Sequence, residues 1–124
     1  MNVSRAYLLI GAMYLLVGMA LGMFMGSHED FTLAPVHAHI NLLGFALMTI
    51  FGLAYRLLPH MADTLLARAH FWLHQSGALV FVAALYLKLS GTVTSGSVDA
   101  VLAASSGVVF LGMLCWAVNL FRNL

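Results

Sequence analysis

Residues 36–59 limit the possible folds more than any other part of the chain. The segment is apolar and carries no charged side chain before Arg56. A helix of about 20 residues, rising 1.5 Å per residue, crosses the ~30 Å hydrocarbon layer of a bilayer. The segment is therefore predicted to be a transmembrane helix. Pro59, which lacks an amide hydrogen and has a fixed φ, is predicted to end it.

Two histidines, His37 and His39, stand at the start of this segment. An imidazole inside a membrane is costly unless it is paired, ligated or close to water, so it is a functional hypothesis by default. Side chains two positions apart on an α-helix point about 200° away from each other, so these two cannot both bind one small ion. Either they serve two sites on opposite sides of the helix, or one binds a ligand while the other forms a hydrogen bond. The simpler alternative is that both are amphipathic tips at the membrane interface.

The composition predicts an integral membrane protein. Of 124 residues, 63% are hydrophobic and 7% are charged, which no soluble domain of this size tolerates on its surface. The formal net charge is +1 and there is no basic run, so nucleic acid is excluded as a partner. The single cysteine, Cys115, excludes both an intrachain disulfide and a cysteine-based metal site.

Three further apolar stretches complete the predicted fold, an all-α, antiparallel up-down unit of four spans in one membrane domain, residues 1–124. The spans are expected at about 6–25, 36–58, 69–89 and 100–121. Small residues recur every fourth position in the first span (Gly18, Gly22 and Gly26) and in the last (Ala103 and Gly107). This spacing favours close helix packing in lipid.

A second pair of histidines, His70 and His74, lies four positions apart and therefore on one helix face. This spacing can serve a metal ion, with His60 or Asp63 as the third ligand, from residues 59–68, which are predicted to form a turn. Alternatively, both histidines face lipid headgroups beside Trp72.

The basic residues predict the orientation. Four of the five fall at one end of the unit: Arg5, Arg56, Arg68 and Arg122. By the positive-inside rule both termini are expected in the cytoplasm, with a bacterial inner membrane as the expected location. His37 and His39 then lie near the outer face, and His70 and His74 near the inner one, about 20–30 Å away. Within one chain, the two pairs are not expected to bracket one planar cofactor.

The His37-Ala38-His39 run, followed by Gly52 and by Tyr-Arg-Leu-Leu-Pro at 55–59, resembles a helix of the catalytic subunit of haem-copper oxidases and their nitric oxide reductase relatives. In that family an H-x-H pair opens a helix at the outer side of the membrane and a proline closes it at the inner side. The first histidine binds the active-site haem and the second a low-spin haem. The resemblance covers about 25 residues in detail. It implies haem b as cofactor, with His37 and His39 as iron ligands.

The large subunit of that family has twelve spans in three arcs of four, and this chain is similar to one arc. The resemblance therefore implies a homo-oligomer, with a trimer favoured, and a haem at each interface between copies of the chain. The iron would be bound by His37 of one subunit and His39 of the next. Lys88 is the basic side chain available to the haem propionates, and Asn41 or Tyr86 can supply a hydrogen bond to an iron ligand.

Oxidases of the family also hold a copper ion through three further histidines, two of them at the outer end of another helix. The corresponding residues here, 88–93, include no histidine, so neither copper nor oxygen reduction is expected. A haem with two histidine ligands fits electron transfer or redox sensing, and one with a single ligand fits sensing of O₂ or NO.

Two other classes of function stay open. One is a transporter or sensor of a small metal ion that uses His60, His70 and His74. The other is a non-catalytic accessory subunit that assembles with a larger respiratory complex through its glycine faces. In every class the lipid bilayer is a partner, and a haem protein would also need an electron donor.

Overall fold

The computed structural model describes residues 1–124, and all of its regular structure is helical. The elements in chain order are α1 (Val3–His28), α2 (Ala34–His39), η1 (Ile40–Ala46), α3 (Leu47–Leu57), α4 (Pro59–Ala62), α5 (Leu65–Leu89) and α6 (Ser97–Asn123). The second span is one helical stretch, Ala34–Leu57, in which a π-helix, η1, joins α2 to α3. The predicted all-α class is confirmed.

Four helical stretches are long and apolar enough to cross a membrane: Val3–His28, Ala34–Leu57, Leu65–Leu89 and Ser97–Asn123. They confirm the predicted four-span membrane protein. The prediction that residues 59–68 form a turn is wrong, because they contain α4 and the start of α5. Thr64 caps α5 by accepting a hydrogen bond from the amide of Ala67 at 3.1 Å, so this helix begins at Leu65 rather than at residue 69.

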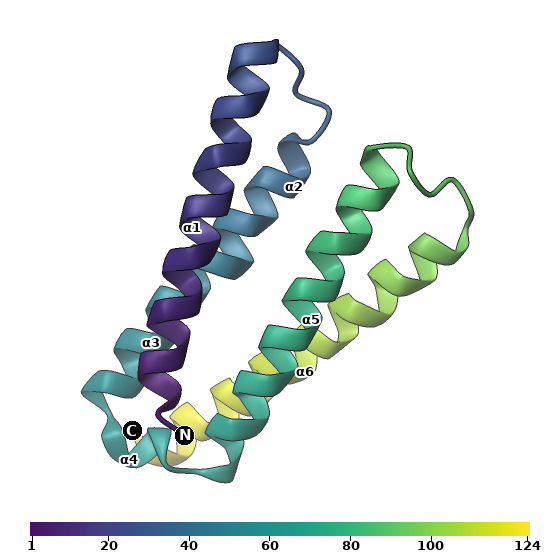
Figure 1. Ribbon diagram of the computed structural model, residues 1–124. Coiled ribbons are helices and arrows are strands. Elements are labelled where there is room, and N and C mark those ends of the chain that lie inside the picture. Colours follow the sequence, from purple (N-terminus) through teal and green to yellow (C-terminus); the bar gives the residue numbers. More distant parts are fainter.

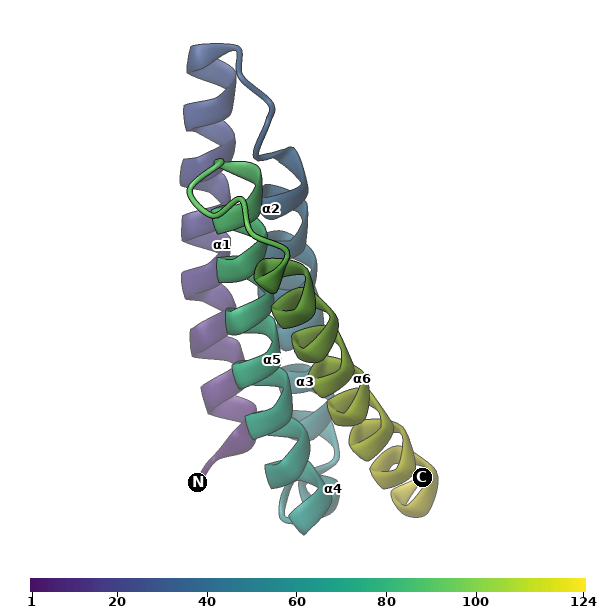
Figure 2. The same ribbon diagram turned by 90° about the vertical axis from the view of Figure 1, so that its right-hand side faces the viewer.

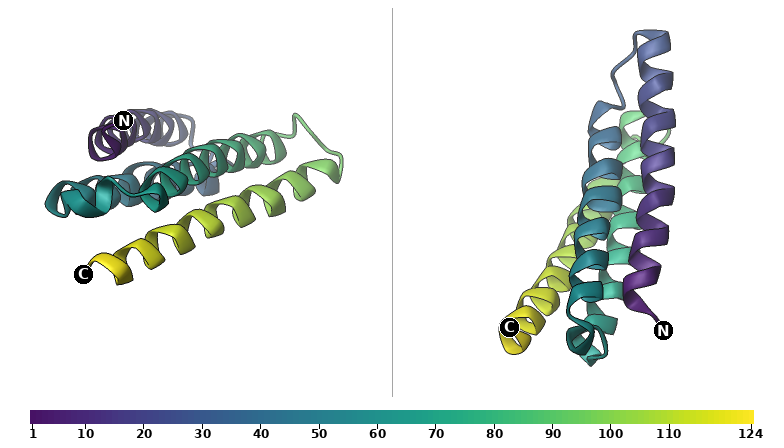
Figure 3. Two further views of the ribbon diagram at one scale, coloured as in Figure 1. Left: turned by 90° about the horizontal axis from the view of Figure 1, so that it is seen from below. Right: turned by 90° about the vertical axis from the view of Figure 1, so that its left-hand side faces the viewer.

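The four spans form two helical hairpins, one of α1 with the second span and one of α5 with α6 (Figure 1). The hairpins meet at the end that holds both termini and diverge toward the other end (Figure 1). A quarter turn shows α6 leaning away from α5 toward the C-terminus (Figure 2). Seen from below, α1 and α6 lie at opposite edges, with the second span and α5 between them (Figure 3). The unit thus consists of two hairpins that pack together at the end with the termini and are apart at the other end.

The core lies at the end that holds the termini. Its eight buried residues are Val3, Tyr7, Met48, Phe51, Tyr55, Met61, Ala67 and Phe71. Ser4 fastens α1 to α3 there, since its hydroxyl donates to the Gly52 carbonyl oxygen at 2.9 Å. Fully buried Asn119 fastens α6, donating to the Met61 carbonyl oxygen and accepting from the Thr64 hydroxyl, both at 3.0 Å. The polar groups of Ser4 and Asn119 are thus paired inside the chain, as a lipid environment requires.

Glycines set the close approach of the helices, although not all the predicted ones do. A Cβ atom on Gly18 or Gly22 would lie 2.6 Å from Asn41 Oδ1 or 2.9 Å from His37 Cε1, respectively. At Gly26 and Gly107 no atom would lie within 4 Å. The predicted packing role of these last two is therefore wrong within one chain.

We predict that Gly44→Ala, in η1, destabilises the protein. The new Cβ would lie 2.1 Å from Tyr14 Cδ1 and 2.6 Å from Tyr14 Cβ, so α1 itself must move. Overpacking of this kind costs about 1–3 kcal/mol. The measurement is the midpoint of thermal unfolding in detergent. Gly107→Ala is the matched control, since it meets nothing and gains helix propensity, and should leave the midpoint unchanged or raise it. Equal midpoints for both variants would contradict the packing described.

Candidate functional site

His37 lies half-buried against α1, in the notch that Gly18 and Gly22 leave open. Its Nδ1 is 2.8 Å from the carbonyl oxygen of Gly18. A carbonyl oxygen only accepts, so Nδ1 must carry the proton and donate it. The lone pair of this imidazole is therefore on Nε2.

His39 lies on another side of the same helix, where its ring packs on Phe81 of α5 with the ring centroids 4.9 Å apart. Its Nδ1 is 2.7 Å from the carbonyl oxygen of Pro35, and the same argument assigns the proton to Nδ1 and the lone pair to Nε2. The two histidines thus face different helices of their own chain, in agreement with their predicted divergence. They share one tautomer, fixed in each case by a backbone carbonyl group.

Of the other residues predicted around the two histidines, only Asn41 contacts one of them. Asn41 does lie against His37, because its Nδ2 donates to the His37 carbonyl oxygen at 2.9 Å and is 3.4 Å from both ring nitrogens. Tyr86 is 47% exposed and forms no hydrogen bond with either histidine. Lys88 is ion-paired with Asp99 of the same chain, so it would have to leave this carboxylate to meet a propionate.

His70 and His74 do not face headgroups, because both are fully buried. That predicted alternative is wrong, since α5 begins four residues earlier than expected and carries both histidines into the core, with Trp72 exposed on another face. Their ring centroids are 5.9 Å apart. His70 Nδ1 is 2.9 Å from the hydroxyl oxygen of Tyr55, a partner that no local sequence pattern indicated.

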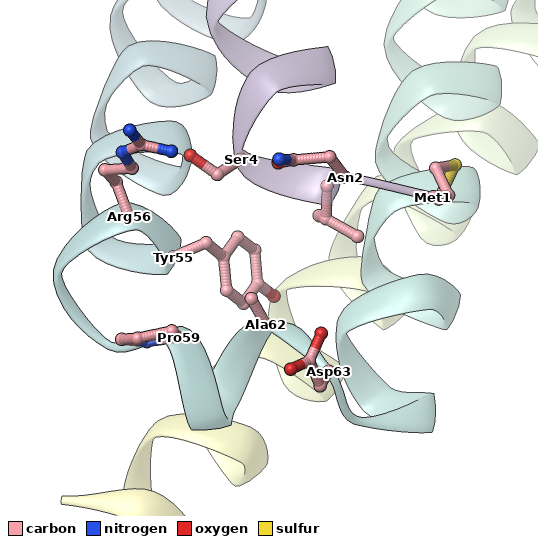
Figure 4. A pocket seen from close by; sticks show the side chains of 9 residues that line it. Met1, Asn2, Ser4, Tyr55, Arg56, Pro59, Ala62 and Asp63 are labelled. Atoms are coloured by element: carbon pink, nitrogen blue, oxygen red, sulfur yellow. The ribbon is translucent and has the colours of Figure 1, made fainter.

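The expected third ligands lie elsewhere. His60 Nε2 donates to the carbonyl oxygen of Asn123 at 2.9 Å, near the C-terminus. Asp63 lines a surface pocket at the end that holds the termini (Figure 4). No three His, Cys, Asp or Glu side chains are grouped so that they could hold a metal ion. The three-ligand site predicted around His70 and His74 is thus not assembled in this chain.

The pocket that Asp63 lines encloses about 510 Å³ between the start of α1 and the α3–α4 turn. Asn2, Ser4, Arg56 and Asp63 give it a polar lining, and the ring of Tyr55 forms part of its wall (Figure 4). Because the Tyr55 hydroxyl also contacts His70, this residue connects the pocket with the buried histidines.

His74 has a defined structural task in the π-helix. Its Nε2 donates to the carbonyl oxygen of Leu43 at 2.9 Å. In η1 the amide of Leu47 bonds to the Leu42 carbonyl oxygen, five positions back, and α-helical bonding resumes afterwards. Where bonding changes from five to four positions, one carbonyl group is left without a helical partner, and the next in line is that of Leu43. His74 supplies the missing donor.

We predict that His74→Phe destabilises the protein, because it leaves the Leu43 carbonyl oxygen buried without a donor. The cost of such a group is about 1–3 kcal/mol. His74→Gln, which keeps an N–H group, should retain part of this stability. The measurements are thermal unfolding in detergent and hydrogen exchange of the amides of residues 43–48. If His74→Phe matched the wild type in both, the bond would have no structural role.

Comparison with known proteins gives no match to a protein-family model, a curated protein or a solved structure. The resemblance of residues 36–59 to haem-copper oxidases therefore stays a prediction from those residues. The imidazoles of His37 and His39, at the end of the second span away from the termini, are the side chains of this segment that can bind a metal.

Proposed function

We propose that this chain is a membrane haem protein in which His37 and His39 bind the iron of a b-type haem shared between copies of the chain. The function that follows is electron transfer or redox sensing, with sensing of O₂ or NO as the variant in which only one histidine binds the iron. The observation that carries the proposal is that both imidazoles donate their Nδ1 proton to a backbone carbonyl oxygen.

This hydrogen bond is one that a metal-ligating histidine needs, although it does not by itself identify one, since the exposed His28 makes it with the Phe24 carbonyl oxygen at 2.9 Å. Metal-ligating histidines almost always donate their other ring N–H to a carbonyl or carboxylate group, which fixes the tautomer and raises the basicity of the ligating nitrogen. Here Gly18 and Pro35 provide these acceptors, so each Nε2 has a lone pair to offer. The donor set thus fits haem iron, which takes neutral imidazole ligands.

The surroundings of His39 also fit an apolar macrocycle. The ring lines a groove of about 230 Å³ between the second span and the α5–α6 hairpin, together with Leu42, Leu43, Phe81, Ser106 and Val109. Ser106 and His39 supply its side-chain polar groups, and no charged side chain lines it. Such a wall suits a porphyrin face, while the charged propionates would need the polar outer end of the unit.

The positions of His37 and His39 support sharing of the haem between chains. Because His37 and His39 lie on different sides of one helix, a single chain presents two separate ligands rather than a pair. A head-to-tail contact that closes into a ring brings unlike faces of neighbouring copies together, so one copy's His37 can be paired with the next copy's His39. A trimer of arcs with both termini in the cytoplasm is the arrangement we propose. When bound, haem supplies one-electron chemistry at its iron.

We predict that the protein purified in detergent from haem-supplemented cells is red, with a reduced-minus-oxidised spectrum of b-type haem. His37→Ala and His39→Ala should each reduce bound haem at least about tenfold, the scale on which lost supporting contacts weaken metal sites. His28→Ala and His60→Ala are matched controls, because these histidines are exposed and outside the site. Colourless wild-type protein, or equal loss in all four variants, would contradict the proposal.

Sharing between chains gives a second prediction. When chains with His37→Ala and chains with His39→Ala are co-expressed under two affinity tags, some interfaces regain one intact histidine from each chain. Random mixing restores roughly a quarter of the interfaces in a closed ring. Tandem-purified hetero-oligomers should therefore bind haem, although each variant alone does not. If the mixture is as colourless as the single variants while it co-purifies, both ligands must come from one chain.

A further inference from the structure

Four buried polar atoms have no hydrogen-bond partner within the chain: Tyr7 Oη, His70 Nε2, His74 Nδ1 and Trp116 Nε1. Native proteins leave few such atoms, and each demands an explanation. The side chains of Tyr7, His70 and His74 are fully buried, so lipid and bulk water do not reach them. None of these four atoms has a role in the proposed haem site.

The four rings gather around one side chain. Their centroids lie between 4.5 and 5.6 Å from that of Phe51, with His70 nearest. Tyr7 also lies 5.3 Å from His70 and 6.1 Å from His74, centroid to centroid. The side chains that carry the unpartnered atoms therefore pack in one cluster, which we name the Phe51 cluster: Tyr7, Phe51, His70, His74 and Trp116.

The chemistry of these atoms defines what they can bind. His74 Nδ1 is an acceptor, because its Nε2 carries the proton that binds the Leu43 carbonyl oxygen. The indole N–H of Trp116 is only a donor, and the Tyr7 hydroxyl is both. A cation would face the indole N–H without any carboxylate nearby, since all four acidic residues lie in connections or at a helix start: Glu29, Asp30, Asp63 and Asp99. An anion would face the His74 lone pair.

We propose that the Phe51 cluster is a binding site for water inside the membrane, continuous with the polar pocket at the termini. Water is the smallest neutral molecule that donates and accepts, and a buried water needs two to four polar partners, which the cluster supplies. Tyr55 makes the connection, because its ring lines the pocket and its hydroxyl contacts His70 (Figure 4). Polar groups thereby extend from one surface of the unit to Leu43 in the second span.

Hydroxyl-radical footprinting by X-ray radiolysis tests this on the wild-type protein in detergent, with or without pigment. Radicals formed from a bound water oxidise the side chains around it even when these are fully buried. We expect Tyr7 to be oxidised at least fivefold faster than Tyr14, which is less buried, lines two surface grooves and has no place in the cluster. After mixing with H₂¹⁸O, the oxygen added at Tyr7 should be ¹⁸O. Oxidation of Tyr7 no faster than Tyr14, or retention of ¹⁶O, would overturn the proposal.

Replacement of Tyr7 by Phe gives an independent test, because the midpoint of thermal unfolding should change differently for a hydrated and for a dry hydroxyl group. If the hydroxyl is bound to water, Tyr7→Phe should lower the midpoint of thermal unfolding by at least about 2 °C. If the hydroxyl is dry and unpartnered, its removal should leave the midpoint unchanged or raise it, which would count against the site. Tyr86→Phe is the matched control, because it removes an exposed hydroxyl group.

Discussion

The hydrogen bond from His74 to the Leu43 carbonyl oxygen is the interaction on which the arrangement of the two hairpins depends. In lipid, every backbone polar group has to be satisfied inside the protein, because no water is present to replace a missing partner. The π-helix leaves one carbonyl group of the second span without a helical donor, and α5 of the other hairpin provides it. The bond therefore joins the hairpins, together with the contact of the Tyr55 hydroxyl with His70 Nδ1 at 2.9 Å and the bond from Gln75 Nε2 to Met48 Sδ at 3.4 Å. Gly77 and Gly112 set the close packing of α5 on α6 within the second hairpin.

The same π-helix sets the direction in which His37 and His39 face. One extra residue in a helical turn rotates everything before it by about 100° relative to everything after it. Below η1, Met48, Phe51 and Tyr55 face the core that contains His70 and His74. Above η1, His37 faces α1 and His39 faces α5. A regular helix could not present both sets in these directions. The π-helix therefore places the histidines, and the carbonyl group that it leaves without a helical donor is the one that His74 satisfies.

The sequence predicted what depends on hydropathy and helical periodicity, and missed what depends on tertiary contacts. The four spans, the end of the second span at Leu57 just before Pro59, and the divergence of His37 from His39 all follow from local pattern. The π-helix has no such mark, because its sequence is that of an ordinary apolar helix and the donor to its freed carbonyl group lies 31 positions away. The burial of His70 likewise depends on the helix cap at Thr64 and on Tyr55, neither of which the four-residue spacing of the histidines reveals.

The two histidine pairs differ in solvent exposure, and this difference determines which molecules can reach them. His70 and His74 are fully enclosed, with one nitrogen of each already bonded inside the chain. A large planar group cannot reach them without separating the hairpins at their core. His37 and His39 are partly exposed, and their second nitrogens carry lone pairs directed by backbone acceptors. A cofactor that arrived from the lipid or with another copy of the chain would therefore meet His37 and His39, while His70 and His74 would be out of its reach.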